Sequence, residues 1–149
     1  MRDNGQDMNG ACLCGAVTVS AHLPGNEVQA CHCRQCQTWT GGGPLWAIRA
    51  KDVTFGGDEN IATYHASEHG ERAFCKICGT TLYWKLQGRS VAFLPVGLVP
   101  DQGSLRVTEE IFVDHRPGWL TPFSKAKQQD EATMQAQLAA FLAKEGSHA

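Results

Sequence analysis

Short runs of alternating apolar and polar residues fill the chain as far as about residue 120, and glycine, proline or aspartate separates them. Val17, Val19 and Ala21 alternate with polar neighbours, a period of two that is typical of a half-buried β-strand. The same reasoning predicts further strands at 44–48, 61–64, 81–86, 91–96 and 105–113. We therefore expect a mainly β fold over this part of the chain.

The last segment has the pattern of a helix instead. Residues 130–145 contain no glycine or proline. Their larger apolar residues follow the i, i+4, i+7, i+8 spacing of one helix face: Met134, Leu138, Phe141 and Leu142. Asp130 is a candidate N-cap and Gly146 a candidate stop, so we predict one C-terminal α-helix. Its apolar face is expected to cover the β core, with homodimer formation as the alternative use.

Composition and charge narrow the class of protein. The chain has 149 residues, of which 42% are hydrophobic and 19% charged, as in globular proteins. We expect a single domain over 1–149, with a β part at 8–122 and a helical extension at 123–149. The net charge of -2, without a run of Lys or Arg, argues against nucleic acid as a partner. No apolar run has the length of a signal peptide core or a membrane span, so a cytoplasmic, reducing setting is expected.

The seven cysteines are then better explained as metal ligands than as disulfides. Seven is an odd number, and a bridge within Cys12/Cys14 or Cys31/Cys33 would close a strained loop over one intervening residue. The cysteines form three clusters with zinc-ligand spacing: Cys12-Leu13-Cys14-Gly15, Cys31-His32-Cys33-Arg34-Gln35-Cys36 and Cys75-Lys76-Ile77-Cys78-Gly79. We therefore predict two Zn²⁺ ions for each chain.

Zinc coordination suggests how the clusters divide. A structural zinc takes four ligands, commonly two separated pairs, so the economical assignment joins Cys12, Cys14, Cys75 and Cys78. The triplet Cys31, Cys33 and Cys36 then holds a second ion with one position open, as in catalytic zinc sites. A closed site with one histidine is the alternative, and four histidines are candidates: His32, His65, His69 and His115.

An open site of this kind favours thiol chemistry. Three thiolates leave the Zn²⁺ site with a net charge of -1, so it activates water less strongly than a site of neutral imidazoles. The site is well suited to bind a soft external thiol as thiolate, which can then add to a small carbonyl compound. We therefore expect Cys31, Cys33 and Cys36 to be the catalytic residues.

All three clusters, in this order, resemble the glutathione-dependent formaldehyde-activating enzyme family, which also includes the centromere protein V-like proteins. The resemblance covers roughly residues 8–122 and is carried by these segments: 10–17, 31–36, 40–41, 74–82, 111–113 and Trp119. It implies a β-tent of short sheets around zinc, similar to the Rab nucleotide-exchange accessory factor, and the same division of the cysteines. Many members have a histidine just before the segment that matches 111–113, where this chain has Glu110 and its nearest histidine is His115.

For function, the resemblance implies a zinc-dependent carbon–sulfur lyase that forms S-(hydroxymethyl)glutathione from formaldehyde and glutathione. A small-molecule thiol, glutathione, is the expected partner. Two alternatives stay open: a non-catalytic zinc module that binds another macromolecule, and a carrier that binds glutathione without accelerating a reaction.

Overall fold

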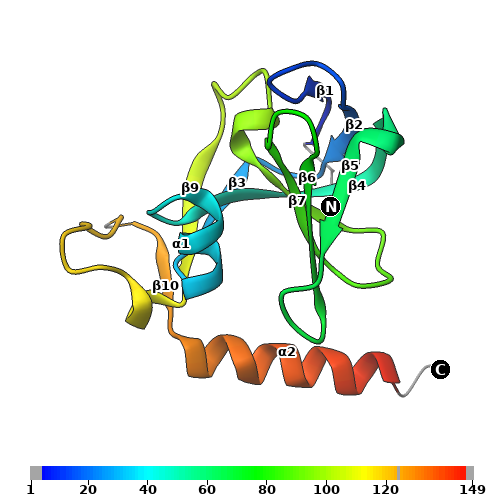
Figure 1. The fold of residues 1–149 in the computed structure, drawn as a ribbon. Coiled ribbons are helices and arrows are strands. Elements are labelled where there is room, and N and C mark those ends of the chain that lie inside the picture. The colour runs from blue at the N-terminus through cyan, green and yellow to red at the C-terminus, as the bar shows by residue number, and fades with distance from the viewer. Residues whose placement is uncertain (1–4, 124, 147–149) are drawn as a thin grey trace. The chain divides into compact units, whose positions relative to one another are not determined.

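The computed structural model describes residues 5–123 and 125–146 and places them in two compact units. The first unit contains the described residues up to Val28 together with Trp46–Arg106, and the second contains Gln29–Leu45 with the described residues from Val107 onward. Strands dominate the first unit and outnumber helices over the chain, so the fold is mainly β, as the alternating pattern predicts (Figure 1).

Antiparallel strands build the first unit. β1 pairs with β2, β2 pairs with β4, and a second series runs from β4 through β8, β7 and β6 to β5. Their bounds are β1 Gln6–Ala11, β2 Thr18–Leu23, β4 Leu45–Gly56, β5 Ile61–Tyr64, β6 Gly70–Cys75, β7 Thr81–Leu86 and β8 Ala92–Pro95. A 3-10 turn at Asp58–Asn60 connects β4 to β5, and a second one at Val96–Leu98 follows β8.

The core of the first unit follows from the period of two. In β2 the apolar residues Val19, Ala21 and Leu23 are buried while Thr18 and Ser20 face solvent. Strands β4, β7 and β8 add their inward side chains to the same cluster, which also contains two cysteines: Cys12 and Cys75. Two of the four metal-ligand candidates of this unit are therefore part of its core.

The second unit combines strands with two helices. β9 (Arg106–Ile111) pairs with β3 (Glu27–Cys31) and runs parallel to β10 (Lys127–Gln129). The C-terminal helix α2 spans Glu131–Gly146, close to the expected 130–145, and a 3-10 turn at Val113–His115 contacts it. The side chain of Asp130 accepts the backbone N–H of Thr133 at 2.9 Å, which confirms the predicted N-cap.

Two expectations about the elements need correction. The chain has a second, short helix, α1 (Arg34–Thr40), whose seven residues are too few to show an apolar period. Strand β4 continues to Gly56, well past the predicted end at residue 48. The second half of β4 alternates half-buried and exposed positions, and Asp52 within it has a positive φ of 51°. Because this half contains several polar residues, its sequence lacks the apolar run that would predict a strand.

Candidate metal centre

The first cysteine cluster brings together two pairs of sulfur atoms that lie about sixty residues apart in the sequence. The Sγ atoms of Cys12, Cys14, Cys75 and Cys78 all lie within 4.8 Å of one another. The Cys12–Cys14 separation is 3.6 Å and the Cys14–Cys75 separation is 3.9 Å. A tetrahedral zinc with Zn–S bonds of about 2.3 Å places its sulfurs about 3.8 Å apart. The spacing therefore fits a four-sulfur ion site.

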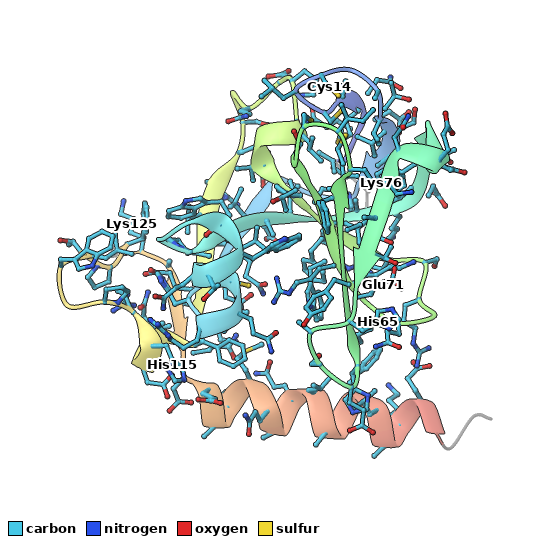
Figure 2. All side chains as sticks on the ribbon, in the orientation of Figure 1. Cys14, His65, Glu71, Lys76, His115 and Lys125 are labelled. Carbon is cyan, nitrogen blue, oxygen red and sulfur yellow. The ribbon has the colours of Figure 1, made fainter. Side chains whose placement is uncertain are left out.

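Tight turns with the same geometry shape both halves of this cluster. Cys12 follows β1, and the N–H of Gly15 donates to its carbonyl oxygen at 3.0 Å. Cys75 ends β6, and the N–H of Gly79 donates to its carbonyl oxygen at 2.9 Å. Both glycines have a positive φ, 81° for Gly15 and 76° for Gly79, which a residue with a Cβ adopts only with strain. Cys14, labelled in Figure 2, lies in the first of these turns.

Hydrogen-bond donors lie next to two of the four sulfurs, those of Cys12 and Cys78. The backbone N–H of Val17 donates to the Cys12 Sγ at 3.3 Å. The Thr80 hydroxyl lies 3.1 Å from the Cys78 Sγ and lowers the pKa of that thiol to about 5. The same hydroxyl oxygen accepts the N–H of Leu13 at 3.0 Å, which links the two turns. Donors at sulfur stabilise the thiolate form that a metal needs.

The second cluster lies where β3 passes into α1. Cys31 ends the strand, Cys33 is the N-cap of the helix and Cys36 is in its first turn. Their three Sγ atoms lie within 4.8 Å of one another, and Cys31 and Cys36 are largely buried. The Cys33 Sγ accepts the backbone N–H of Cys36 at 3.3 Å. A helix cap therefore sets the spacing of two of the three sulfurs.

The three neighbouring thiols of this cluster need a cation beside them if all of them are to ionise. The neighbouring thiols of Cys33 and Cys36, together with burial, raise the pKa of Cys31 well above its ordinary value. Three thiols this close cannot all ionise unless a positive charge compensates them. A divalent, thiophilic ion such as Zn²⁺ supplies that charge, and both clusters can therefore hold a metal ion.

The histidines proposed as a fourth ligand have other partners. Among the described residues, no His, Cys, Asp or Glu joins Cys31, Cys33 and Cys36 within the 4.8 Å limit. The His32 ring is turned to Glu110, with Nε2 at 2.8 Å from Oε1. His65 pairs with Glu71 at 3.2 Å, and His69 with Glu68 at 3.8 Å, all four in the first unit.

His115 is also engaged, because its Nε2 is bonded to the Glu131 side chain at the start of α2. This hydrogen bond, with the nearby Asp114 charge, raises the pKa of His115. The Asp114 Oδ1 accepts the backbone N–H of Glu131 at 2.8 Å. These three residues form a third group of possible metal ligands, but their hydrogen bonds already explain the arrangement as a cap for α2.

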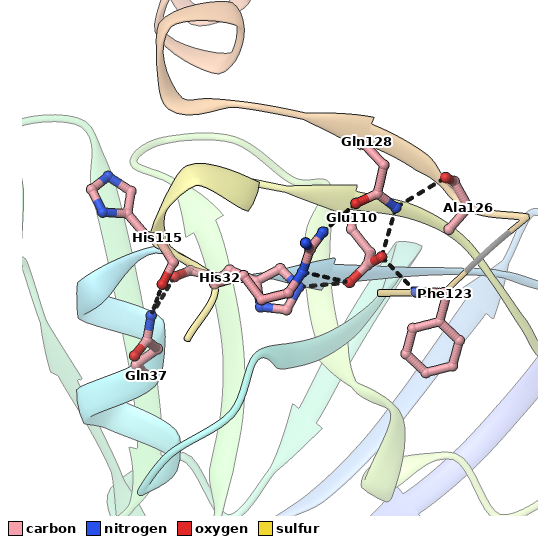
Figure 3. Close-up of polar contacts among 8 residues, drawn as sticks. His32, Gln37, Glu110, His115, Phe123, Ala126 and Gln128 are labelled. Atoms are coloured by element: carbon pink, nitrogen blue, oxygen red, sulfur yellow. Dashed lines mark hydrogen bonds and ion pairs between the residues drawn. The ribbon is translucent and has the colours of Figure 1, made fainter. Parts of the chain in front are cut away.

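A buried polar network beside the second cluster was missed in the sequence. Glu110 is 1% exposed and accepts hydrogen bonds from His32, from the Phe123 N–H at 2.9 Å and from Gln128 Nε2 at 2.6 Å (Figure 3). Burial alone raises the pKa of Glu110, but these donors and Arg116 outweigh it, so the pKa is lowered. The sequence pointed to Glu110 only as the residue that stands where many members of the resembled family have a histidine, directly before Ile111-Phe112.

The described helices include none that is both long and apolar enough to cross a membrane.

Comparisons with known proteins identify the family and a similar fold. Residues 7–115 match the family described as glutathione-dependent formaldehyde-activating enzyme. An uncharacterized lyase of Schizosaccharomyces pombe is 29% identical over 113 residues, which cover 74% of this chain and 82% of the yeast protein. The crystal structure of a Rhodobacter sphaeroides protein superposes with a TM-score of 0.56 at 23% identity, covering 68% of this chain and all of that one. Because the family match covers most of the chain, the protein belongs to the glutathione-dependent formaldehyde-activating enzyme family.

Proposed function

We propose that this protein is a zinc-dependent carbon–sulfur lyase of the S-(hydroxymethyl)glutathione synthase type. The observation that carries the proposal is the group of three sulfurs at Cys31, Cys33 and Cys36, which has no fourth ligand among the described His, Cys, Asp and Glu side chains. Membership of the family supports glutathione and formaldehyde as the substrates. The lyase name of the yeast relative supports the reaction class.

The reaction makes or breaks one carbon–sulfur bond. In the forward direction the sulfur of glutathione adds to the carbonyl carbon of formaldehyde, and the proton of the thiol ends on the carbonyl oxygen. The reverse direction returns both reactants, so no oxidant or further substrate is needed. The task of the site is to hold the sulfur as thiolate next to a small aldehyde.

Cys31, Cys33 and Cys36 would hold the second zinc, while Cys12, Cys14, Cys75 and Cys78 would hold a structural one. The second zinc would supply a coordination position that binds the thiol and lowers its pKa. The chain itself sets the geometry, since the α1 cap fixes Cys33 relative to Cys36 and β3 fixes Cys31. None of the seven cysteines forms a disulfide, which suits the reducing conditions of the cytoplasm.

Exchange measured by NMR between formaldehyde, glutathione and their adduct tests the proposal against the uncatalysed reaction. The zinc-loaded protein should accelerate exchange, and Cys36→Ala should return the rate to the background. Thr38→Ala, an exposed position on α1, is the control variant and should keep the acceleration.

Two results would contradict the proposal. A protein that binds glutathione but leaves the exchange rate at background is a carrier and not a lyase. An acceleration that survives in Cys36→Ala would place the chemistry away from the three-cysteine cluster.

A further inference from the structure

His32, the residue between two cysteines of the second cluster, is held on three sides. Its N–H donates to the Ile111 carbonyl oxygen at 3.0 Å, and its own carbonyl oxygen accepts Gln37 Nε2 at 2.7 Å. Its ring Nε2 meets Glu110 Oε1 at 2.8 Å. The side chain is fully buried. Because backbone and ring are both fixed, the positions of Cys31 and Cys33 on either side are fixed with them.

Glu110 joins this residue to a later part of the chain. One carboxylate oxygen, Oε1, faces the His32 ring and lies 3.6 Å from the Arg116 Nε. The other, Oε2, accepts the Phe123 N–H and Gln128 Nε2. Arg116 also bonds the Gln128 side chain, which closes the network (Figure 3). Three of the four partners of Glu110 come after residue 115, where the family match ends.

We propose that Glu110 is a positioning residue for the second metal site: it ties His32 to the segment 116–129 and so fixes the backbone that carries Cys31 and Cys33. This inference rests on the part of the proposed function in which the three cysteines hold a metal. Glu110 itself is not a ligand in this account, because its two oxygens are occupied by His32 and the later segment.

Chemistry explains why a carboxylate is needed at this position. Among the described residues, Glu110 accepts hydrogen bonds from the His32 ring N–H, the Phe123 N–H and the Gln128 amide, and it forms an ion pair with the Arg116 guanidinium. Two carboxylate oxygens can accept from all of them, whereas a glutamine has one acceptor oxygen and would point an NH₂ group at donors. Such a buried mismatch loosens the groups that it faces.

Glu109 provides a matched control on the same strand. Its carboxylate also bonds residues of the two neighbouring strands: it accepts a hydrogen bond from Gln29 Nε2 on β3 at 2.9 Å and another from Gln129 on β10. No hydrogen bond or ion pair joins Glu109 to His32 among the described residues, and neighbouring residues on a strand face opposite sides. If the loss of any carboxylate charge on β9 weakens the protein, Glu109→Gln and Glu110→Gln should therefore be affected alike.

Metal affinity, measured by competition with a chromogenic chelator in the absence of glutathione, tests the inference. Loss of a hydrogen-bond partner outside the ligand set typically weakens metal binding 10- to 100-fold, and we expect about 10-fold for the three-cysteine site in Glu110→Gln. The four-cysteine site should keep its affinity in the same molecule. In cobalt-loaded protein, the absorption bands of the second site should shift in Glu110→Gln and stay unchanged in Glu109→Gln.

Either of two results would overturn the inference: wild-type affinity and spectrum at the second site in Glu110→Gln, or an equal loss in Glu109→Gln. If Glu110→Gln does not fold, Gln128→Ala replaces it, because Gln128 is exposed and donates to Glu110. A weaker second site in that variant supports the inference, and an unchanged one contradicts it. A wild-type protein that binds both metals but does not respond to glutathione would contradict the proposed function alone.

Discussion

The amide side chain of Gln37 shows how single residues hold the second cluster in place. Its Nε2 donates both to the His32 carbonyl oxygen at 2.7 Å and to the His115 carbonyl oxygen at 2.9 Å. Its Oε1 accepts from Arg34 Nη1 at 3.1 Å. One buried side chain thereby satisfies two backbone carbonyl groups, those of His32 and His115, which lie 83 residues apart in the sequence.

Gln37→Met should therefore destabilise the protein. Methionine has a similar length but no donor, so the two carbonyl groups lose their partner, at a cost of about 1–3 kcal/mol. Urea denaturation of the zinc-loaded protein measures the change in the free energy of unfolding. Thr38→Met, at an exposed position of the same helix, is the control and should change it by less than about 0.5 kcal/mol. Equal losses in both variants would contradict this role.

Tyr83 and Glu71 make stability depend on pH in the alkaline range. The Tyr83 hydroxyl donates to Glu71 Oε2 at 2.5 Å, and Glu71 also pairs with His65 at 3.2 Å; Figure 2 labels Glu71 and His65. Burial, followed by the Glu71 charge, raises the pKa of Tyr83. A group with a raised pKa contributes its full stability below the unfolded value, about 10 for tyrosine, and loses it as pH rises toward the folded value.

The free energy of unfolding should accordingly fall more steeply for the wild type than for Tyr83→Phe above about pH 10, where only the wild type releases this proton on unfolding. Urea denaturation across this range measures the difference. Parallel curves for the two proteins would show that Tyr83 has no raised pKa.

At the scale of the elements, the start of α2 depends on two aspartates. The Asp130 Oδ1 accepts the Thr133 N–H, and the Asp114 Oδ1 accepts the Glu131 N–H. These bonds satisfy two of the four N–H groups that the first turn of a helix leaves without a partner. The hydrogen bonds from Thr133 also lower the pKa of Asp130.

Asp130→Ala should reduce the helical circular dichroism signal at intermediate temperatures, since it removes the cap. Asp130→Asn keeps an acceptor oxygen at the same place and should retain most of the signal. If the two variants melt alike, the side chain of Asp130 does not cap α2.

The elements that could be predicted are those whose own pattern is sufficient. The 3.6-residue stripe and its cap predict α2, and strict alternation predicts β2. α1 could not be predicted in this way, because its N-cap is the cysteine sulfur of Cys33 and its seven residues carry no stripe. The cysteine clusters were found because ligand spacing is local, whereas the His32–Glu110 contact joins residues 78 positions apart and leaves no pattern in the sequence.

At the scale of the whole molecule, each unit contains one cysteine cluster. Cys12, Cys14, Cys75 and Cys78 belong to the first unit, and two of them are part of its apolar core. Cys31, Cys33 and Cys36 belong to the second unit, at the junction of β3 and α1. The two clusters should therefore differ in what their loss does to the protein.

Cys75→Ala should unfold the protein or prevent soluble expression, because structural zinc contributes on the order of 10 kcal/mol to the folding of small metal-binding domains. Cys36→Ala should stay folded and contain one zinc in place of two. Zinc content and thermal unfolding of the two variants measure this difference. Equal damage in both would contradict the separate roles of the clusters.

The most direct test of the central claim is the absorption spectrum of a protein with cobalt in the three-cysteine site and zinc in the four-cysteine site. Glutathione should increase the sulfur-to-cobalt charge-transfer absorption to a saturating level, because a fourth thiolate joins those of Cys31, Cys33 and Cys36. S-methylglutathione, which keeps both carboxylates but has no free thiol, should leave the spectrum unchanged. A spectrum that does not respond to glutathione, or responds equally to both compounds, would contradict an open metal site that binds the thiol.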